Sequence, residues 1–515
     1  MSDTTTLILV ELDYVGADGQ QGIARFSSAA FTTGRADTPP DTSFLPLLDD
    51  APELSLSAFT DGSTGGTPRR KVGKISLSNA DGRLDWLLAV AVDGRALRVR
   101  IGPQGGRYPQ DFAVWMNTVA EGIECSRNDR LDIVISDGMA AFDKEVTNTL
   151  YKGDNVAPLG VEGTENDLKD KPKPRLFGRC DNITPVCVNP WKLIYQVNDG
   201  TVHDIPAAYD RGVALSRGPD AADLDDLMNN APDEAHYRVW LAGGLLRVGS
   251  AVSGLTADVL EGATPADRTV AQILTRVADI VGHTDIDWQD VHTLDVLQPA
   301  ETGVYITGAD TALRVMDTLA AGIGAWVSID GGGALRMGRL DAPAGQPVVT
   351  LHDYLISDIK LLRSRDTGGG RPAKKISIEF GYNWTRQSDN SIAGSVDVER
   401  KAWLEQQTRT AVWEDDVIAQ RHLMAADFER STPLLNRADA DAELERLAGL
   451  YSVPRLLLRL KVSRPEMLVR FPLLMLGDLV EVFFSRYGLQ EGRLMRVIAI
   501  TSRAASDLLE LDLWG

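Results

Sequence analysis

The sequence has 515 residues, with 73 Asp or Glu and 53 Lys or Arg, so its formal net charge at pH 7 is −20. Hydrophobic residues make up 43% and charged residues 24%, a globular balance that excludes a largely disordered chain. The negative charge opposes a general affinity for nucleic acid, since phosphate contacts need clustered Lys and Arg.

The length predicts about three or four domains, at about 100–200 residues each. No stretch of about 18 residues is apolar throughout, which predicts no stable membrane insertion. The start of the chain lacks a basic region and carries Glu11 and Asp13 after a short apolar run, so it predicts a first strand and not a signal peptide. Three cysteines (Cys125, Cys180 and Cys187) are too few for a disulfide framework, and their role stays open.

Residues 1–150 are predicted to form a β domain. Leu97, Val99 and Ile101 alternate with arginines, as in a half-buried strand, and LDIVI at 131–135 indicates another. Asp-Gly pairs, which are typical of turns, separate such runs. The segment DGSTGGTPRRK at 61–71 predicts a solvated loop.

Residues 151–255 are predicted to form a mixed β domain. Its first part, 152–174, is polar and rich in Gly, Pro and Asp, and it has neither the strand nor the helix period. This composition predicts a linker or a domain boundary. The remainder mixes short strands with turns and includes the segment YQVNDG at 195–200.

Residues 256–345 are predicted to form a small α+β domain. Ile273, Val277 and Ile280 fall on one face of a helix. Asp310 is the expected N-cap of a second helix. A strand at 325–329, a tight turn and a returning strand at 334–340 then form a hairpin.

Residues 346–515 are predicted to form a second β domain with a helical insertion. Residues near 411–450 read as helical, with Leu444 and Leu447 on one side. The end of the chain has several apolar runs of strand length, which suggest a barrel or a sandwich. These runs are 456–462, 479–484, 494–500 and 508–514. The fold class is therefore expected to be α+β and mainly β.

The sequence contains little that indicates catalysis. No pair among its six histidines has the i, i+4 spacing of a metal site, and there is no P-loop or nucleophile elbow. The segment HTDIDWQD at 283–290 could hold a cation, but it lacks the glycine and terminal glutamate of a calcium loop, and a solvated connection is favoured. Cys180 and Cys187 lack the second ligand pair of a structural zinc site. We therefore expect no catalytic, cofactor-binding or metal-binding residues.

The segment 173–215 resembles a pattern found in tail-tip proteins of siphophages and prophages. It reads KPRLFGRC-DNITPV at 173–186, IYQVNDG at 194–200 and AYDRG at 208–212, where Ala208 replaces the usual Val. Further pieces agree with this pattern: 73–94, 312–343, and the run GDLVEVFFSRYGL at 477–489 before the terminal LWG. The residues that carry the resemblance, with an expected structural role, are Pro174, Gly178, Asn182, Pro185, Tyr195, Gln196, Asp199, Gly200, Tyr209, Asp210, Arg211, Gly212, Gly477, Asp478, Arg486, Tyr487 and Gly488.

The resembled family is the baseplate hub, or tail-tip hub, of long-tailed phages, which is similar to the hubs of contractile phage baseplates and gene transfer agents. The resemblance implies that residues 1–150 and 346–515 form two tail-tube-like β-barrel domains. It implies a homotrimer, in which six barrels match the sixfold tail tube or distal tail ring above. It also implies a tape measure protein in the lumen, fibres or a spike below, and DNA that passes without specific binding. The location would be the tail tip of a virion assembled in the bacterial host cytoplasm, and the protein would not be an enzyme.

Two other interpretations stay open from the sequence. The first is a tail-associated hydrolase of cell wall or polysaccharide, which needs two carboxylates in a groove or a metal site. The second is a receptor-binding or carbohydrate-binding module, which predicts exposed aromatic side chains on a distal face.

Overall fold

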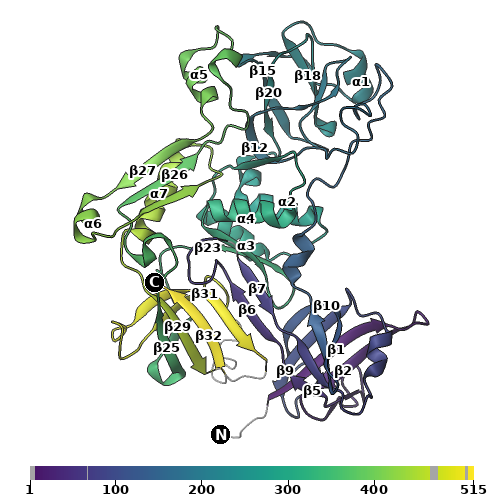
Figure 1. The fold of residues 1–515 in the computed structure, drawn as a ribbon, viewed down its shortest axis with the longest axis vertical. Coiled ribbons are helices and arrows are strands. Elements are labelled where there is room, and N and C mark those ends of the chain that lie inside the picture. The colour runs from purple at the N-terminus through teal and green to yellow at the C-terminus, as the bar shows by residue number, and fades with distance from the viewer. Residues whose placement is uncertain (1–5, 67, 464–473, 505–507) are drawn as a thin grey trace.

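The computed structural model describes residues 6–66, 68–463, 474–504 and 508–515, and it is α+β and mainly β. Two large sheets lie at one end of the molecule, and smaller sheets and helices extend away from them (Figure 1). This confirms the predicted fold class. Within the described residues, no helix is both long and apolar enough to cross a membrane.

The first large sheet is built from the N-terminal region, with strand order β2-β1-β9-β10-β11-β8-β5. Along β9, Leu97, Val99 and Ile101 are buried and the residues between them are not, as the alternation predicted. The strands are β1 Thr6–Val15, β2 Gln21–Ser27, β5 Leu48–Asp50, β8 Ile75–Ser78, β9 Ala96–Pro103, β10 Ala113–Arg127 and β11 Arg130–Ile135. Between β2 and β5 in the sequence, β3 Phe31–Thr32 pairs with β4 Ser43–Phe44 as a separate two-stranded sheet.

The second large sheet has the order β24-β30-β31-β32-β29-β25 and comes from the C-terminal region. Its strands are β24 Val349–Leu351, β25 Ile356–Leu362, β29 Leu457–Ser463, β30 Leu479–Val482, β31 Arg493–Arg503 and β32 Leu508–Trp514. The four C-terminal strands expected from sequence are confirmed. A hairpin from the N-terminal region, β6 Glu53–Ser57 and β7 Arg69–Val72, joins this sheet because β6 pairs with β31.

Two five-stranded sheets form the middle region, which lies at the far end of the molecule from the two large sheets (Figure 1). One has the order β16-β15-β20-β12-β21 and the other β13-β14-β19-β18-β17. The strands are β12 Arg175–Ile183, β13 Val186–Asn189, β14 Ile194–Gln196, β15 Asp204–Asp210, β16 Val213–Ala214, β17 Ser216–Arg217, β18 His236–Trp240, β19 Leu245–Val248, β20 Leu255–Leu260 and β21 Gly303–Ile306. Helix α1 spans Leu224–Asn229.

The polar segment 152–174 has neither helix nor strand, but it is not an extended linker. Its neighbour Tyr151 is buried, with Val161 and Leu168 packed in the same apolar cluster. Isolated bridges and turns, such as Asp154 with Thr164, fold the segment back on itself.

The predicted α+β unit is present as three helices and a hairpin. These are α2 Val270–Ile280, α3 Trp288–Leu297, α4 Ala312–Gly322, β22 Ala325–Ile329 and β23 Leu335–Arg339. Two expectations are corrected. Thr311, not Asp310, caps α4, since its hydroxyl accepts from the Arg314 N–H. The segment 283–290, which was expected to be a solvated connection, includes the first turn of α3, which Asp287 caps.

The predicted helical stretch at 411–450 is only partly helical. It contains β27 Arg409–Glu414, α6 Asp416–Arg421, β28 Asp427–Ser431 and α7 Arg437–Tyr451. The two strands form because both pair with β26 Lys375–Phe380, β27 antiparallel and β28 parallel. Residues 381–408, here called the arm, connect β26 to β27 and extend to the middle region. The arm includes α5 Val398–Glu405, which lies beside that region (Figure 1).

Candidate functional site: a polar joint between the middle region and the arm

The first group of motif residues fixes the start of the middle region. Gly178 has a φ of +72°, and a side chain there would begin 2.1 Å from the carbonyl oxygen of Thr302, so only glycine fits. Its N–H donates to a carboxylate oxygen of Glu261 at 2.9 Å. Pro174, which is buried, accepts from the N–H of Asp199 at 2.7 Å, so the turn after β14 is held against the start of β12.

The YQVNDG segment also has a structural role. The amide oxygen of Gln196 accepts from the Tyr151 hydroxyl at 2.6 Å, and burial raises the pKa of Tyr195 to about 12. Gly200 adopts a φ of +108° at the end of the turn. The segment therefore closes a turn against Tyr151.

The second group forms a joint with the arm, here called the polar joint, made by Asn182, Tyr209 and Asp258 of the middle region and Asn383 and Arg400 of the arm. The Asn182 N–H and the Tyr209 hydroxyl donate to the two carboxylate oxygens of Asp258, at 2.8 Å and 2.9 Å. The Asn182 side-chain amide donates to Asn383 Oδ1 at 2.8 Å. The guanidinium carbon of Arg400 lies 4.1 Å from the centroid of the Tyr209 ring.

Burial dominates the electrostatics of the polar joint. It raises the pKa of Asp258 and, together with the Asp258 charge, raises the pKa of Tyr209 to about 12. The positive charge of Arg400 opposes both pKa shifts, because it stabilises the ionised forms of Asp258 and Tyr209. Both oxygens of Asp258 are engaged, which suits a structural carboxylate better than an acid-base catalyst.

Other motif residues extend the contact with the arm. Arg211 donates to the backbone carbonyls of Asn390 and Ser391, at 3.3 Å and 3.2 Å. A side chain at Gly212 would begin 2.7 Å from Leu404 Cδ1 of α5. Asp210 accepts from the N–H groups of Ser253 and Gly254 within its own region, and Pro185 is buried. The motif between 182 and 212 thus marks one half of a contact whose other half lies about two hundred residues later.

The C-terminal motif residues lie in the second large sheet, apart from the polar joint. Gly477 has a φ of +86° and donates to the Val497 carbonyl at 2.8 Å, at the entry to β30. Asp478 accepts from the Met475 N–H, and burial raises its pKa. Arg486, Tyr487 and Gly488 form the turn after β30, with the Arg486 guanidinium carbon 5.9 Å from the Tyr487 ring centroid.

Two carboxylates of the acidic segment at 283–290 bond within the fold. Asp287 caps α3, and Asp290 binds Arg336 with N–O distances of 2.6 Å and 3.1 Å. In the part of the chain that the structure describes, no group of three or more His, Cys, Asp or Glu side chains is placed to hold a metal ion. Sequence reasoning missed Asp258, Asn383 and Arg400, because each lies far along the chain from the motif and no local pattern marks it.

Known proteins with similar structures include several tail proteins. A scan against protein-family models gives no match, and neither does a search of curated proteins. The tail protein from Neisseria meningitidis MC58 has 11% identity and a TM-score of 0.42, covering 99% of this chain and 96% of that one. A chain in the virion of a native gene transfer agent has 14% identity and a TM-score of 0.43, covering 74% and 92%. The 43 kDa tail protein of prophage MuSo2 from Shewanella oneidensis has 11% identity and a TM-score of 0.40, covering 99% and 98%.

Proposed function

We propose that this chain is a structural component of a phage tail tip, a trimeric baseplate hub that adapts a sixfold tail tube or distal tail ring to a threefold tip. The observation that carries the proposal is the placement of the two large sheets. They come from opposite ends of the chain yet lie side by side at one end of the molecule (Figure 1). Three copies would present six such sheets, the number that a sixfold partner needs.

The hairpin β6–β7 supports this arrangement. It leaves the N-terminal region and pairs with β31 over five residue pairs, from Ala499 with Ser57 to Arg503 with Glu53. The Ser55 and Thr501 hydroxyls also lie 2.9 Å apart across the pair. Two sheets tied in this way keep a fixed spacing, which a ring of alternating units requires.

The polar joint suits the same role. It joins the arm to the middle region through the buried Asn182–Asn383 hydrogen bond and the Arg400 guanidinium stacked on the Tyr209 ring. A hub must hold fibres or a spike below and the tail tube above without losing its shape.

The net charge of −20 would let DNA pass through a lumen that also holds the tape measure protein, with no specific binding. The expected location is the virion tail tip, after assembly in the host cytoplasm.

The test is the mass of the purified chain by light scattering at several concentrations, with negative-stain images of the same peak. The expected result is three times the chain mass of 55.9 kDa, seen as a ring with a central hole. A monomer at every concentration that also fails to join purified tail tubes would contradict the proposal. Clearing of cell-wall preparations in a zymogram would favour the hydrolase instead.

A further inference from the structure

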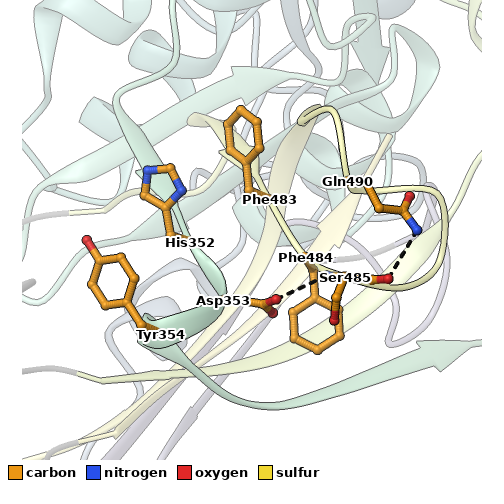
Figure 2. A pocket seen from close by; sticks show the side chains of 7 residues that line it. All are labelled: His352, Asp353, Tyr354, Phe483, Phe484, Ser485 and Gln490. Carbon is orange, nitrogen blue, oxygen red and sulfur yellow. Dashed lines mark hydrogen bonds between the residues drawn. The ribbon is translucent and has the colours of Figure 1, made fainter.

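A shallow pocket lined with aromatic rings lies in the second large sheet, and three of its residues, at 483–485, fall within the run 477–489 that resembles the family pattern. It is formed by the turn after β24, which includes a short 3-10 helix at Asp353–Leu355, and by the turn after β30. We call it the aromatic pocket. Its lining residues, drawn in Figure 2, are His352, Asp353, Tyr354, Phe483, Phe484, Ser485 and Gln490.

Three rings of the aromatic pocket form a stacked row. The His352 ring lies 5.8 Å from the Tyr354 ring, with 13° between their planes, and 5.2 Å from the Phe483 ring, with 26°. Tyr354 stands at the end of the row and is 73% exposed (Figure 2). A large aromatic ring this exposed has lost little water on folding, so a ligand that covers it gains free energy.

Hydrogen bonds from backbone and side-chain groups hold the two turns in place. The Phe483 N–H donates to the Leu351 carbonyl at 2.8 Å, and the Ser485 N–H donates to Asp353 Oδ2 at 3.2 Å. The Gln490 amide donates to the Ser485 carbonyl at 3.1 Å. Asp353, Ser485 and Gln490 are therefore fixed beside the rings before any ligand arrives, which lowers the entropy cost of binding.

Several polar groups of the aromatic pocket are free to bind a ligand. Among the described residues, the Tyr354 hydroxyl, the Ser485 hydroxyl and the His352 ring nitrogens have no hydrogen-bond partner, and Asp353 Oδ1 has none either. The aromatic pocket thus offers an apolar platform next to acceptors and donors that lie at its edge.

This chemistry selects among ligand classes. Among the described residues, no Lys or Arg lines the aromatic pocket, so a phosphate-bearing ligand would meet the Asp353 carboxylate without a counter-charge. A wholly apolar ligand would displace water from the same carboxylate and from the Gln490 amide, and it would offer no hydrogen bonds in place of those lost. A neutral sugar ring avoids both costs, because its C–H face can cover Tyr354 while its hydroxyls bond to the polar groups.

We propose that the aromatic pocket binds a neutral pyranose unit of a polysaccharide, with Tyr354 as the stacking platform and Asp353, Ser485 and Gln490 as hydrogen-bonding partners. The proposal goes beyond the structural role and does not depend on it, since the residues of the aromatic pocket belong to a single chain. A monomer that bound sugar would keep this inference while contradicting the trimer.

The test is saturation-transfer NMR on the full chain with maltotetraose, chitotetraose and galactobiose, each at about 10 mM, a level that detects millimolar affinity. We expect transfer to the ring protons of at least one sugar. Tyr354→Ala should weaken that binding at least fivefold, and Tyr354→Phe should keep the stacking part. Trp288→Ala, which removes a ring that is 61% exposed on α3, is the matched control and should leave binding unchanged.

Circular dichroism of each variant checks that it folds. Both rings are highly exposed, so removing either one should leave the fold intact. Absence of transfer to all three sugars, or equal binding by wild type and Tyr354→Ala, would overturn the proposal. Binding of an eight-residue oligothymidylate that Tyr354→Ala abolishes would also overturn it, since the aromatic pocket would then accept a phosphate-bearing ligand.

Discussion

The polar joint makes a prediction that can be measured on the isolated protein. Tyr209→Phe removes one hydroxyl and keeps the ring under the Arg400 guanidinium, which lies 4.1 Å from the ring centroid. The hydroxyl donates to Asp258 Oδ2 at 2.9 Å, and no other donor bonds that oxygen among the described residues. The substitution therefore isolates one part-buried hydrogen bond on the middle-region side of the polar joint.

The expected loss in unfolding free energy is about 1–3 kcal/mol, the cost of leaving a partly buried charged acceptor without its partner. The stacking of Arg400 is retained, so its contribution should not be lost as well. Asp258 keeps its bond from the Asn182 N–H at 2.8 Å, which limits the loss to the lower part of this range. The pKa of Asp258, already raised by burial, should rise further.

The assay is urea unfolding followed by tryptophan fluorescence, with limited proteolysis of the arm as a second readout. The control is Tyr382→Phe, which loses an exposed bond from the Gln407 amide at 2.8 Å and should cost less than about 0.5 kcal/mol. Equal unfolding curves for wild type and Tyr209→Phe, with no faster cleavage within 381–408, would refute the idea that the Tyr209–Asp258 bond stabilises the side of the polar joint that receives the arm.

Three further substitutions follow from the structure. Gly178→Ala should cost more than about 2 kcal/mol in urea unfolding, because its Cβ would lie 2.1 Å from the Thr302 oxygen, whereas Gly394→Ala, with nothing within 4 Å, should be nearly neutral. Burial raises the pKa of Asp317 to about 6, so the folded state holds its proton more tightly than the unfolded chain and stability falls as pH rises from about 4 to 6. Asp317→Asn should then add about 1–2 kcal/mol at pH 8, after allowance for partial exposure, and less at pH 5; an equal gain at both pH values would contradict this. Gly477→Val, at a φ of +86°, should cost about 1–2 kcal/mol and reduce incorporation into tails, and Gly477→Asn should recover most of both.

Local patterns in the sequence predicted the elements whose burial depends on local periodicity. The alternation of Leu97, Val99 and Ile101 predicted β9, and the helical spacing of Ile273 and Val277 predicted α2. Both elements bury one regular face, so period and structure agree. The hairpin β22–β23 was predicted for the same reason, with its turn chemistry added.

Elements that depend on distant partners were predicted poorly. β28 was expected to be helical, and it is a strand because it pairs in parallel with β26, about fifty residues earlier. α3 was missed because its apolar residues do not fall on one face: Trp288 and Val296 are 61% and 68% exposed while Val291 and Leu294 are buried. The sequence marked Asn182 and Tyr209 as motif residues but did not predict the polar joint, since nothing near Asn383 or Arg400 in the sequence points to Tyr209.

The pairing of the hairpin β6–β7 with β31 could not be predicted from local composition. The segment 61–71 was expected to be a solvated loop, and its Gly and Ser content fits the turn between the two strands. Its flanks, however, pair with each other and with β31, where Leu56 lies opposite Ile500 and Leu54 opposite Ser502. Leu54 also belongs to the apolar core of the first large sheet. One leucine therefore packs in the core of the first sheet while its backbone pairs in the second. Separating the two sheets would expose that side chain and break a row of backbone hydrogen bonds, at a cost of several kcal/mol. The two sheets must accordingly move as one body, and a partner that binds one of them fixes the orientation of the other.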